Sequence, residues 1–207
     1  SYVIEASELQ GNIPKKLQDV IDKLYATNKK VIFTMGKGGV GKTTIAAAIA
    51  IGLASKGKKV HLTTTDPAAH LRHVIDEMDN IRLSHIDEEE QLEKYKEDVL
   101  SKVRGSISES DLAYIEEIAV FRAFAQIVDN DQDEIVVIDT APTGHTLLLL
   151  DSTQSYHREI ERSQGDIPES VKKLLPKLRN HEDTEVLIVT LAEMTPVYEA
   201  KRLETDL

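Results

Sequence analysis

Residues 36–44 read Gly-Lys-Gly-Gly-Val-Gly-Lys-Thr-Thr, and this stretch decides the fold. It matches the phosphate-loop pattern G-x-x-x-x-G-K-[ST], with Gly36, Gly41, Lys42 and Thr43 at the fixed positions. Glycines let the backbone curl so that successive N–H groups point at phosphate oxygens. In this pattern the lysine brings a positive charge to the β- and γ-phosphates, and the threonine hydroxyl is a ligand for Mg²⁺. The stretch therefore predicts a site for a nucleoside triphosphate.

The segments on either side of this loop have the strand-then-helix order that the pattern requires. Residues 31–35 are a short apolar run that is typical of a strand. Residues 44–55 are rich in Ala and contain no Pro, which indicates a helix, and Gly57 follows where a helix end favours glycine. A chance glycine-rich turn would not have both flanks, so we expect the N-terminus of the helix to face the anion.

A second lysine, Lys37, directly follows the first glycine, where the general pattern does not require one. It marks the deviant loop K-G-G-x-G-K-[ST], in which a signature lysine reaches across a dimer to the nucleotide of the partner. The alternative is a solvated surface charge, and the spacing alone favours neither interpretation. We expect the whole loop to bind the nucleotide, which adds the remaining positions Gly38, Gly39, Val40 and Thr44.

Composition limits the classes of protein to which the chain can belong. Its 207 residues are enough for one domain with a sizeable core. The 36 acidic and 25 basic residues give a formal net charge of −11, which argues against nucleic acid as a main partner. The chain has no Cys, which excludes disulfide bonds and thiolate metal sites. No apolar run approaches the ~20 residues that span a bilayer, and no secretory signal is visible, so we expect a cytoplasmic protein.

Further strands are predicted at residues 59–64, 134–139 and 185–190. The second of these is a continuous β-branched run that ends in an acid, as is typical of a central parallel strand covered on both faces. Strands that alternate with helical stretches imply βαβ crossovers and a doubly wound, mostly parallel α/β sheet with flanking helices. Ligands of such sheets bind at the carboxyl ends of the strands, where three loops carry the distinctive residues: 36–43, 65–70 and 139–145.

We divide the chain into a leading helix and a nucleotide-binding domain. Residues 8–27 have Leu and Ile at helical spacing, and we interpret residues 1–28 as a linker helix that docks on the core. Residues 29–207 would form the domain, with a polar and mostly helical insert at about 76–133. The chain begins without Met and stops shortly after a strand, so we expect the domain to be incomplete at its C-terminal end.

Two acidic residues end predicted strands on the side of the sheet where the phosphate loop lies. Asp139 ends a buried strand, where an unsatisfied charge is costly, so we interpret it as the Walker-B acid that holds Mg²⁺. A helix N-cap is the less favoured alternative. Asp66 could orient or deprotonate the attacking water in nucleotide hydrolysis, or it could cap the segment that begins at Ala68, and the spacing favours neither role.

Three histidines lie near these loops. His70 and His73 are three residues apart, and we interpret them as part of a polar helix face rather than as a metal site. His145 lies shortly after Asp139, where a loop that senses the γ-phosphate would be. It could report the state of the phosphate or bind a ligand, and the alternative is a structural imidazole that caps the next helix.

Taken together, the three loops resemble the arsenite-pump ATPase family, ArsA. The matching segments are residues 36–44, Thr65-Asp-Pro-Ala-Ala-His70 and Asp139-Thr-Ala-Pro-Thr-Gly-His-Thr-Leu-Leu-Leu-Leu150, and the last is the most specific. The similarity extends over nearly the whole chain. The leading helix looks like the linker that introduces the second half of the two-halved bacterial pump subunit.

The resemblance implies ATP hydrolysis, with ATP and Mg²⁺ bound, coupled to efflux of trivalent arsenic or antimony. The partners it implies are a facing ATPase half, in a homodimer or pseudo-dimer, and a membrane efflux protein contacted peripherally at the inner membrane. By this resemblance Thr43 and Asp139, in switch II, would hold Mg²⁺, and His145 would stand where the family places a metalloid-site histidine. The catalytic residues would be Lys37, which reaches the nucleotide of the facing half, Lys42, and Asp66, which positions water from switch I.

One departure from the family concerns the metalloid. The best-known bacterial pump subunits bind it through cysteines, and soft As(III) prefers thiolates, whereas this chain has no Cys. The metalloid site would then lie elsewhere or use histidine, or the substrate differs. A related alternative is a targeting factor for tail-anchored membrane proteins, which ranks lower because such carriers need a wide, often Met-rich groove and this chain has 3 Met. A nucleotide-switched positioning protein on DNA or membrane is disfavoured, since neither a basic surface nor an amphipathic anchor is visible.

Overall fold

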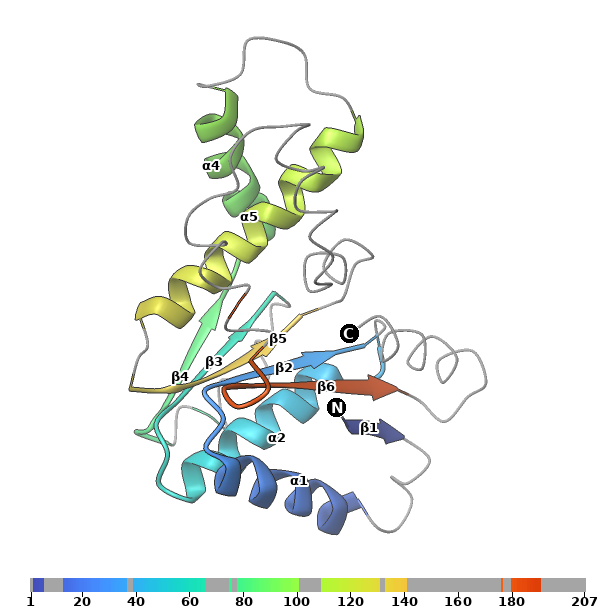
Figure 1. Ribbon diagram of the computed structural model, residues 1–207, viewed down its shortest axis with the longest axis vertical. Coiled ribbons are helices and arrows are strands. Elements are labelled where there is room, and N and C mark those ends of the chain that lie inside the picture. The colour runs from blue at the N-terminus through green and yellow to red at the C-terminus, as the bar shows by residue number, and fades with distance from the viewer. Residues whose placement is uncertain are drawn as a thin grey trace.

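The computed structural model describes residues 2–5, 13–36, 39–65, 75, 78–100, 109–130, 133–140, 176 and 180–190. Within these residues, strands form one parallel sheet in the order β1-β6-β2-β5-β3-β4 (Figure 1). The strands are β1 (Tyr2–Glu5), β2 (Val31–Met35), β3 (Val60–Thr64), β4 (Ile81–His85), β5 (Ile135–Asp139) and β6 (Thr184–Thr190). The helices are α1 (Ile13–Thr27), α2 (Lys42–Ser55), α4 (Glu88–Leu100) and α5 (Glu109–Asn130).

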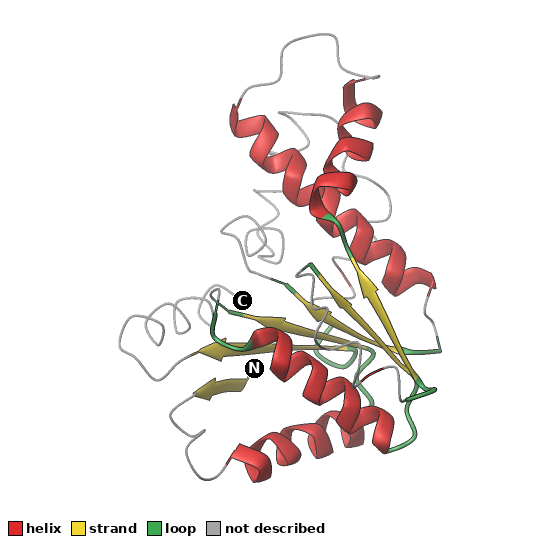
Figure 2. Ribbon diagram, turned by 180° about the vertical axis from the view of Figure 1, so that it is seen from behind, coloured by secondary structure: helices red, strands yellow, loops and turns green. Residues whose placement is uncertain are grey.

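The doubly wound α/β fold predicted from the sequence is confirmed. β2 lies between β5 and β6, which both follow it much later in the chain, and Val31 pairs with Val136 on one side and with Thr184 on the other. Helices cover both faces of the sheet, with α1 and α2 on one face and α5 on the other, and α4 packs against α5 (Figures 1 and 2). This arrangement explains why β2 and β5 are continuous apolar runs, since parallel strands covered on both faces have no solvent side.

The strands divide their side chains between two hydrophobic clusters because successive residues of a strand point to opposite faces. On the α5 face, Phe33 of β2 meets Phe124 of α5 edge-on, with ring centroids 6.2 Å apart. On the other face, Ile32 and Val137 pack against apolar residues of α2, of which Ile49 and Leu53 are fully buried. Burying a large aliphatic or aromatic side chain contributes about 1.5–3 kcal/mol, so these two clusters supply much of the stability of the domain.

α2 is apolar on all sides because the sheet covers one side and α1 covers the other (Figure 2). The two helices approach closely at Gly52, where an added Cβ would lie 2.6 Å from Cδ1 of Ile21 in α1. An ion pair of 2.6 Å between Lys56 Nζ and Asp22 Oδ1 also joins them, and Lys56 lowers the pKa of the Asp22 carboxyl. The leading helix therefore docks directly on the helix that follows the phosphate loop.

Two strands lie where the sequence predicted helix. Residues 2–5 form β1, which pairs with β6, so the linker helix expected over 1–28 is shorter, and α1 begins at Ile13. Residues 81–85 form β4, which pairs with β3 at the sheet edge, inside the stretch 76–133 that was expected to be mostly helical. Only the later part of that stretch contributes α4 and α5, which pack against each other. The domain division at residue 28 stays a prediction.

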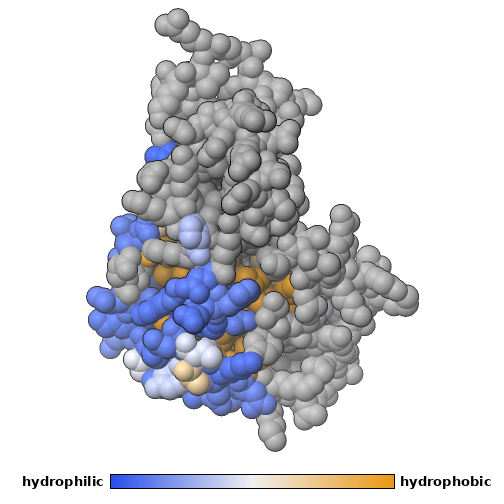
Figure 3. Space-filling model, in the orientation of Figure 1, coloured by the Kyte–Doolittle hydropathy of each residue, from blue (hydrophilic) through white to orange (hydrophobic). Residues whose placement is uncertain are grey.

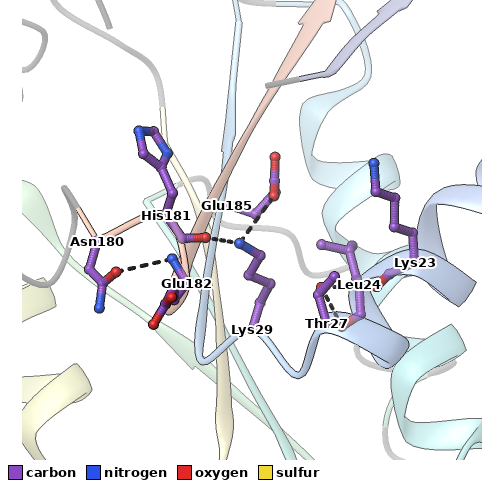
Figure 4. A network of polar contacts seen from close by, with 8 residues as sticks. All are labelled: Lys23, Leu24, Thr27, Lys29, Asn180, His181, Glu182 and Glu185. Atoms are coloured by element: carbon purple, nitrogen blue, oxygen red, sulfur yellow. Dashed lines mark hydrogen bonds and ion pairs between the residues drawn. The ribbon is translucent and has the colours of Figure 1, made fainter.

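A buried lysine ties the amino-terminal end of β2 to the turn before β6 (Figure 4). Nζ of Lys29 donates to the carbonyl oxygen of His181 and lies 3.6 Å from Oε2 of Glu185. The backbone adds to this contact, since the N–H groups of Lys30 and Val31 both donate to the carbonyl oxygen of Asp183, at 2.7 and 3.0 Å. These contacts anchor β2 at its amino-terminal end, whereas the phosphate loop follows its carboxyl-terminal end.

The described surface is mainly hydrophilic on the face shown in Figure 3. Among the described residues, the only large hydrophobic side chain classed as exposed is Tyr25, which is 40% exposed. The ammonium groups of Lys56 and Lys58 lie 5.3 and 5.1 Å from its ring centroid, so the ring is also part of a cation–π contact. None of the helices that the structure describes combines the length and the apolar character needed to cross a bilayer.

Candidate nucleotide-binding site

The phosphate loop joins β2 to α2 at the carboxyl edge of the sheet. Gly36, Gly39 and Gly41 have φ angles of 155°, 79° and 89°, which residues with a side chain rarely adopt. Gly36 also lies directly against β6, because an added Cβ would be 2.2 Å from the carbonyl oxygen of Val189. Only glycine fits at this position, and the loop is therefore held against the neighbouring strand by its backbone.

α2 begins in a geometry that suits an anion. Gly41 is its N-cap residue in the left-handed conformation, and as a glycine it has no side chain to cap the first N–H groups of the helix. The first N–H groups of a helix lack partners within the helix and carry partial positive charge, which favours a phosphate at this end. Lys42 and Thr43 are the first two residues of α2, and both are half-buried. The loop thus presents backbone donors, an ammonium group and a hydroxyl at one end of one helix.

Asp139 lies beside this helix end at the tip of β5 and is 2% exposed. Its Oδ2 accepts a hydrogen bond of 2.6 Å from Oγ1 of Thr43 and another of 3.0 Å from Oγ1 of Thr64. Oγ1 of Thr34 lies 3.4 Å from the other carboxylate oxygen, Oδ1. Hydrogen bonds to a charged acceptor are stronger than neutral ones, and these contacts offset the cost of burying the carboxylate.

The sheet register explains how these side chains meet. Thr34 of β2 and Thr64 of β3 are both paired with Asp139 of β5. Residues paired across neighbouring strands point to the same face of a sheet, so the three side chains form one row. That row lies on the α2 face, where Thr43 begins the helix. The register therefore brings hydroxyls from two strands, β2 and β3, to the carboxylate at the end of β5, and the start of α2 adds a third.

The donor set of this site fits Mg²⁺, a hard cation that takes oxygen ligands from one or two protein groups and from phosphates. The Thr43 hydroxyl has one hydrogen, and the structure directs it toward Oδ2 of Asp139. Because that hydrogen is donated to the carboxylate, the lone pairs of the hydroxyl oxygen point away from it and can face a cation. The carboxylate could hold the same ion through a water ligand.

The structure brings together some of the residues that the sequence singled out. Thr43 and Asp139 are in direct contact, and the other described loop positions lie close to Thr43 in sequence: Gly36, Gly39, Val40, Gly41, Lys42 and Thr44. The remaining predicted site residues fall outside the described residues: Lys37, Gly38, Asp66 and His145, together with His70 and His73. Their roles stay predictions.

Sequence reasoning missed Thr34 and Thr64. Threonine inside an apolar strand looks like an ordinary β-branched residue, and nothing in the local pattern marks its hydroxyl as functional. The one signal was position, since each hydroxyl comes near the carboxyl end of its strand, Thr34 two residues before Gly36 and Thr64 two residues before Asp66. Only the register shows that both reach the same carboxylate.

Comparison with known proteins supports the same family. The family profile described as an anion-transporting ATPase matches residues 29–165. The chain is 45% identical over 201 residues to an arsenical pump-driving ATPase of Escherichia coli, covering 92% of this chain and 34% of that protein. An arsenical pump-driving ATPase of Acidiphilium multivorum is 43% identical over 201 residues, which cover 92% of this chain and 34% of that protein.

An ATPase ASNA1 homolog of Plasmodium chabaudi chabaudi is 33% identical over 70% of this chain and 44% of that protein. The chain spans about a third of the length of the pump-driving ATPases that it matches. The resemblance seen in the three loops is confirmed by the profile, which includes the phosphate loop and Asp139. The chain belongs to the anion-transporting ATPase family.

Proposed function

We propose that the chain is an ATPase domain that binds ATP with Mg²⁺ at the phosphate loop and hydrolyses it to drive export of trivalent arsenic or antimony. The observation that carries the proposal is the 2.6 Å contact between Thr43 Oγ1 and Asp139 Oδ2, which joins the start of α2 to the tip of β5 beside the glycine loop. The names of the relatives support the coupling to a metalloid pump.

Each group in the site has a defined task in this proposal. The loop N–H groups and Lys42 hold the phosphates, and Thr43 and Asp139 hold the metal ion. When bound, Mg²⁺ neutralises charge on the phosphate oxygens. Asp66 orients the attacking water, and Lys37 reaches the nucleotide bound by a facing ATPase half and stabilises charge there, as an arginine finger does.

The conformational change that follows hydrolysis would be transmitted through the loops that follow β3 and β5. The two loops start side by side at Asp139, the last residue of β5. Thr64, the last residue of β3, donates to the Asp139 carboxylate, and the N–H of Thr65 lies 3.4 Å from the carbonyl oxygen of Asp139. Loss of the γ-phosphate releases such segments in other nucleotide switches. In this proposal the change reopens the paired halves and passes to a membrane efflux partner, with His145 as the candidate residue on the metalloid side.

Two measurements test the proposal. Titration calorimetry of the full chain with ATP and Mg²⁺ should show binding, and the absence of heat at micromolar protein and millimolar ATP would refute the nucleotide site. Phosphate release should then be measured with and without As(III) or Sb(III). Stimulation by the metalloid supports the pump, whereas stimulation only by a hydrophobic helical peptide would support the carrier of tail-anchored proteins instead.

A further inference from the structure

The carboxylate of Asp139 is held from two sides by threonine hydroxyls. Oδ2 accepts from Thr43 at 2.6 Å and from Thr64 at 3.0 Å, so one oxygen atom receives a hydrogen from α2 and another from β3. Thr64 is 2% exposed, which leaves its hydroxyl little access to water as an alternative partner. The hydroxyl of Thr64 is therefore a buried donor to the carboxylate.

We propose that Thr64 is a positioning residue for metal binding, an inference that rests on the proposed function. The terminal torsion of an aspartate side chain has a broad energy profile, so a carboxylate rotates easily unless donors fix it. Thr64 supplies such a donor and keeps Oδ2 turned toward Thr43. Thr43 can direct its lone pairs at Mg²⁺ only while Oδ2 receives its hydrogen, so the hydroxyl of Thr64 acts on the metal through Asp139.

The backbone around Thr64 places the same contact at the start of a predicted switch loop. Thr65 follows immediately, and its N–H points to the carbonyl oxygen of Asp139 at 3.4 Å. The sequence continues to Asp66, the residue proposed to orient water. Two contacts with one residue, Asp139, thus fix the point from which the loop departs. Thr64 would therefore link the acid that holds the metal to the segment that handles water.

The preceding residue provides a matched control within the same strand. Thr63 is fully buried, and within the described part of the chain its Oγ1 is the only buried side-chain nitrogen or oxygen without a hydrogen-bond partner. Its register partner on β5 is Ile138, so it points to the opposite face of the sheet from Thr64. Replacing either threonine by valine keeps the branched shape, but only at position 64 does it remove a hydrogen bond to the site.

The experiment compares Thr64→Val, Thr64→Ser and Thr63→Val in the full chain. Binding of a fluorescent N-methylanthraniloyl ATP is measured first in EDTA and then at increasing Mg²⁺, and phosphate release is measured over the same Mg²⁺ range. We expect Thr64→Val to match the wild type in EDTA but to need about 10- to 100-fold more Mg²⁺ for half-maximal response, the usual effect of removing a residue that orients a metal ligand. Thr64→Ser should stay near the wild type, and Thr63→Val should be unchanged.

The outcomes are distinguishable. Equal Mg²⁺ dependence in Thr64→Val and Thr63→Val, with binding in EDTA intact, would overturn the positioning role and leave the proposed function standing. Equal weakening of binding in EDTA and in Mg²⁺ would also overturn it, since the hydroxyl would then be structural. A wild-type chain that binds no nucleotide would refute the proposed function itself. If Thr64→Val does not fold, Thr64→Ala serves in the same comparison.

Discussion

At the scale of single residues, the candidate site is built around a buried acid whose oxygens accept hydrogen bonds from hydroxyl groups. Asp139 accepts from the Thr43 and Thr64 hydroxyls, which contribute no positive charge. A lysine in the same place would neutralise the carboxylate, whereas hydroxyls satisfy its oxygens and leave its negative charge in place. That charge is what an incoming divalent cation needs, so the site suits a metal that arrives with its nucleotide.

Asp139→Asn tests this charge directly. The amide keeps the size of the side chain but removes the negative charge, and we expect hydrolysis at saturating ATP and Mg²⁺ to fall by a factor of about 100, within the range seen for groups that hold catalytic metals and orient their ligands. Steady-state phosphate release measures the effect. The matched control is Asp133→Asn, an exposed acid in the turn before the same strand. Equal rates in both variants would show that Asp139 does not hold the metal.

Gly36→Ala tests the contact between the loop and β6. An added Cβ would lie 2.2 Å from the carbonyl oxygen of Val189, so either the loop or the strand must move. We expect a loss of about 1–3 kcal/mol in the free energy of unfolding beyond that of Gly57→Ala, together with loss of ATP binding. Gly57 is the control because it also has a positive φ, 87°, but its added Cβ meets no atom within 4 Å. Urea unfolding and calorimetry give the two readouts, and equal effects would contradict the close contact.

The site residues divide into those that a local pattern identifies and those that need the register. Thr43 and Asp139 could be predicted because the loop pattern and an acid at the end of an apolar strand are local signals. Thr34 and Thr64 could not, because their contact with Asp139 depends on pairing across β2, β5 and β3, which are far apart in the chain. Hydroxyls on strands become informative only when the strand order is known.

At the scale of elements, the sequence predicted the four inner strands, β2, β3, β5 and β6, and missed β1 and β4 at the two edges of the described sheet. β2 matches the predicted segment, and β3, β5 and β6 match within a residue at each end. β4 reads Ile-Arg-Leu-Ser-His, and its alternation of apolar and polar residues fits an edge strand, but the segment is only five residues long and precedes a charged helix, so the prediction of helix over 76–133 overlooked it. β1 is four residues long, too short for a pattern to be read. Both strands are held by pairing with a neighbour, β1 with β6 and β4 with β3.

The contact between α1 and α2 yields a prediction at this scale. Gly52→Val places methyl groups where Ile21 already lies, and we expect a loss of about 1–3 kcal/mol in the free energy of unfolding. Ile21→Ala alone should also destabilise, by about 2–5 kcal/mol, because Ile21 is buried. In the double variant the cavity accepts the valine, so the combined loss should be smaller than the sum by about 1 kcal/mol or more. Additive losses in urea unfolding would mean that α1 does not dock on Gly52.

At the scale of the whole molecule, the question is whether the site works alone or with a second copy. The proposal assigns Lys37 to the nucleotide of a facing half and Lys42 to the phosphates bound in the same chain. Lys37→Ala should therefore keep ATP affinity within about twofold and lower turnover by about 10³-fold, as removal of an arginine finger does. Lys42→Ala, in contrast, should weaken binding itself. Calorimetry and phosphate release separate the two, and unchanged turnover in Lys37→Ala would refute the role across the dimer.

The strand order also determines when the protein can become functional during its own synthesis. β2 is made early, yet the strands on both its sides, β5 and β6, leave the ribosome much later. Until residue 189 has been translated, Gly36 has no carbonyl to rest against, and Lys29 lacks its acceptor on His181. A nascent chain therefore carries an apolar strand with both edges open, a state that folds slowly and invites aggregation. This exposure ends only when β6 has been translated and can pair with β2.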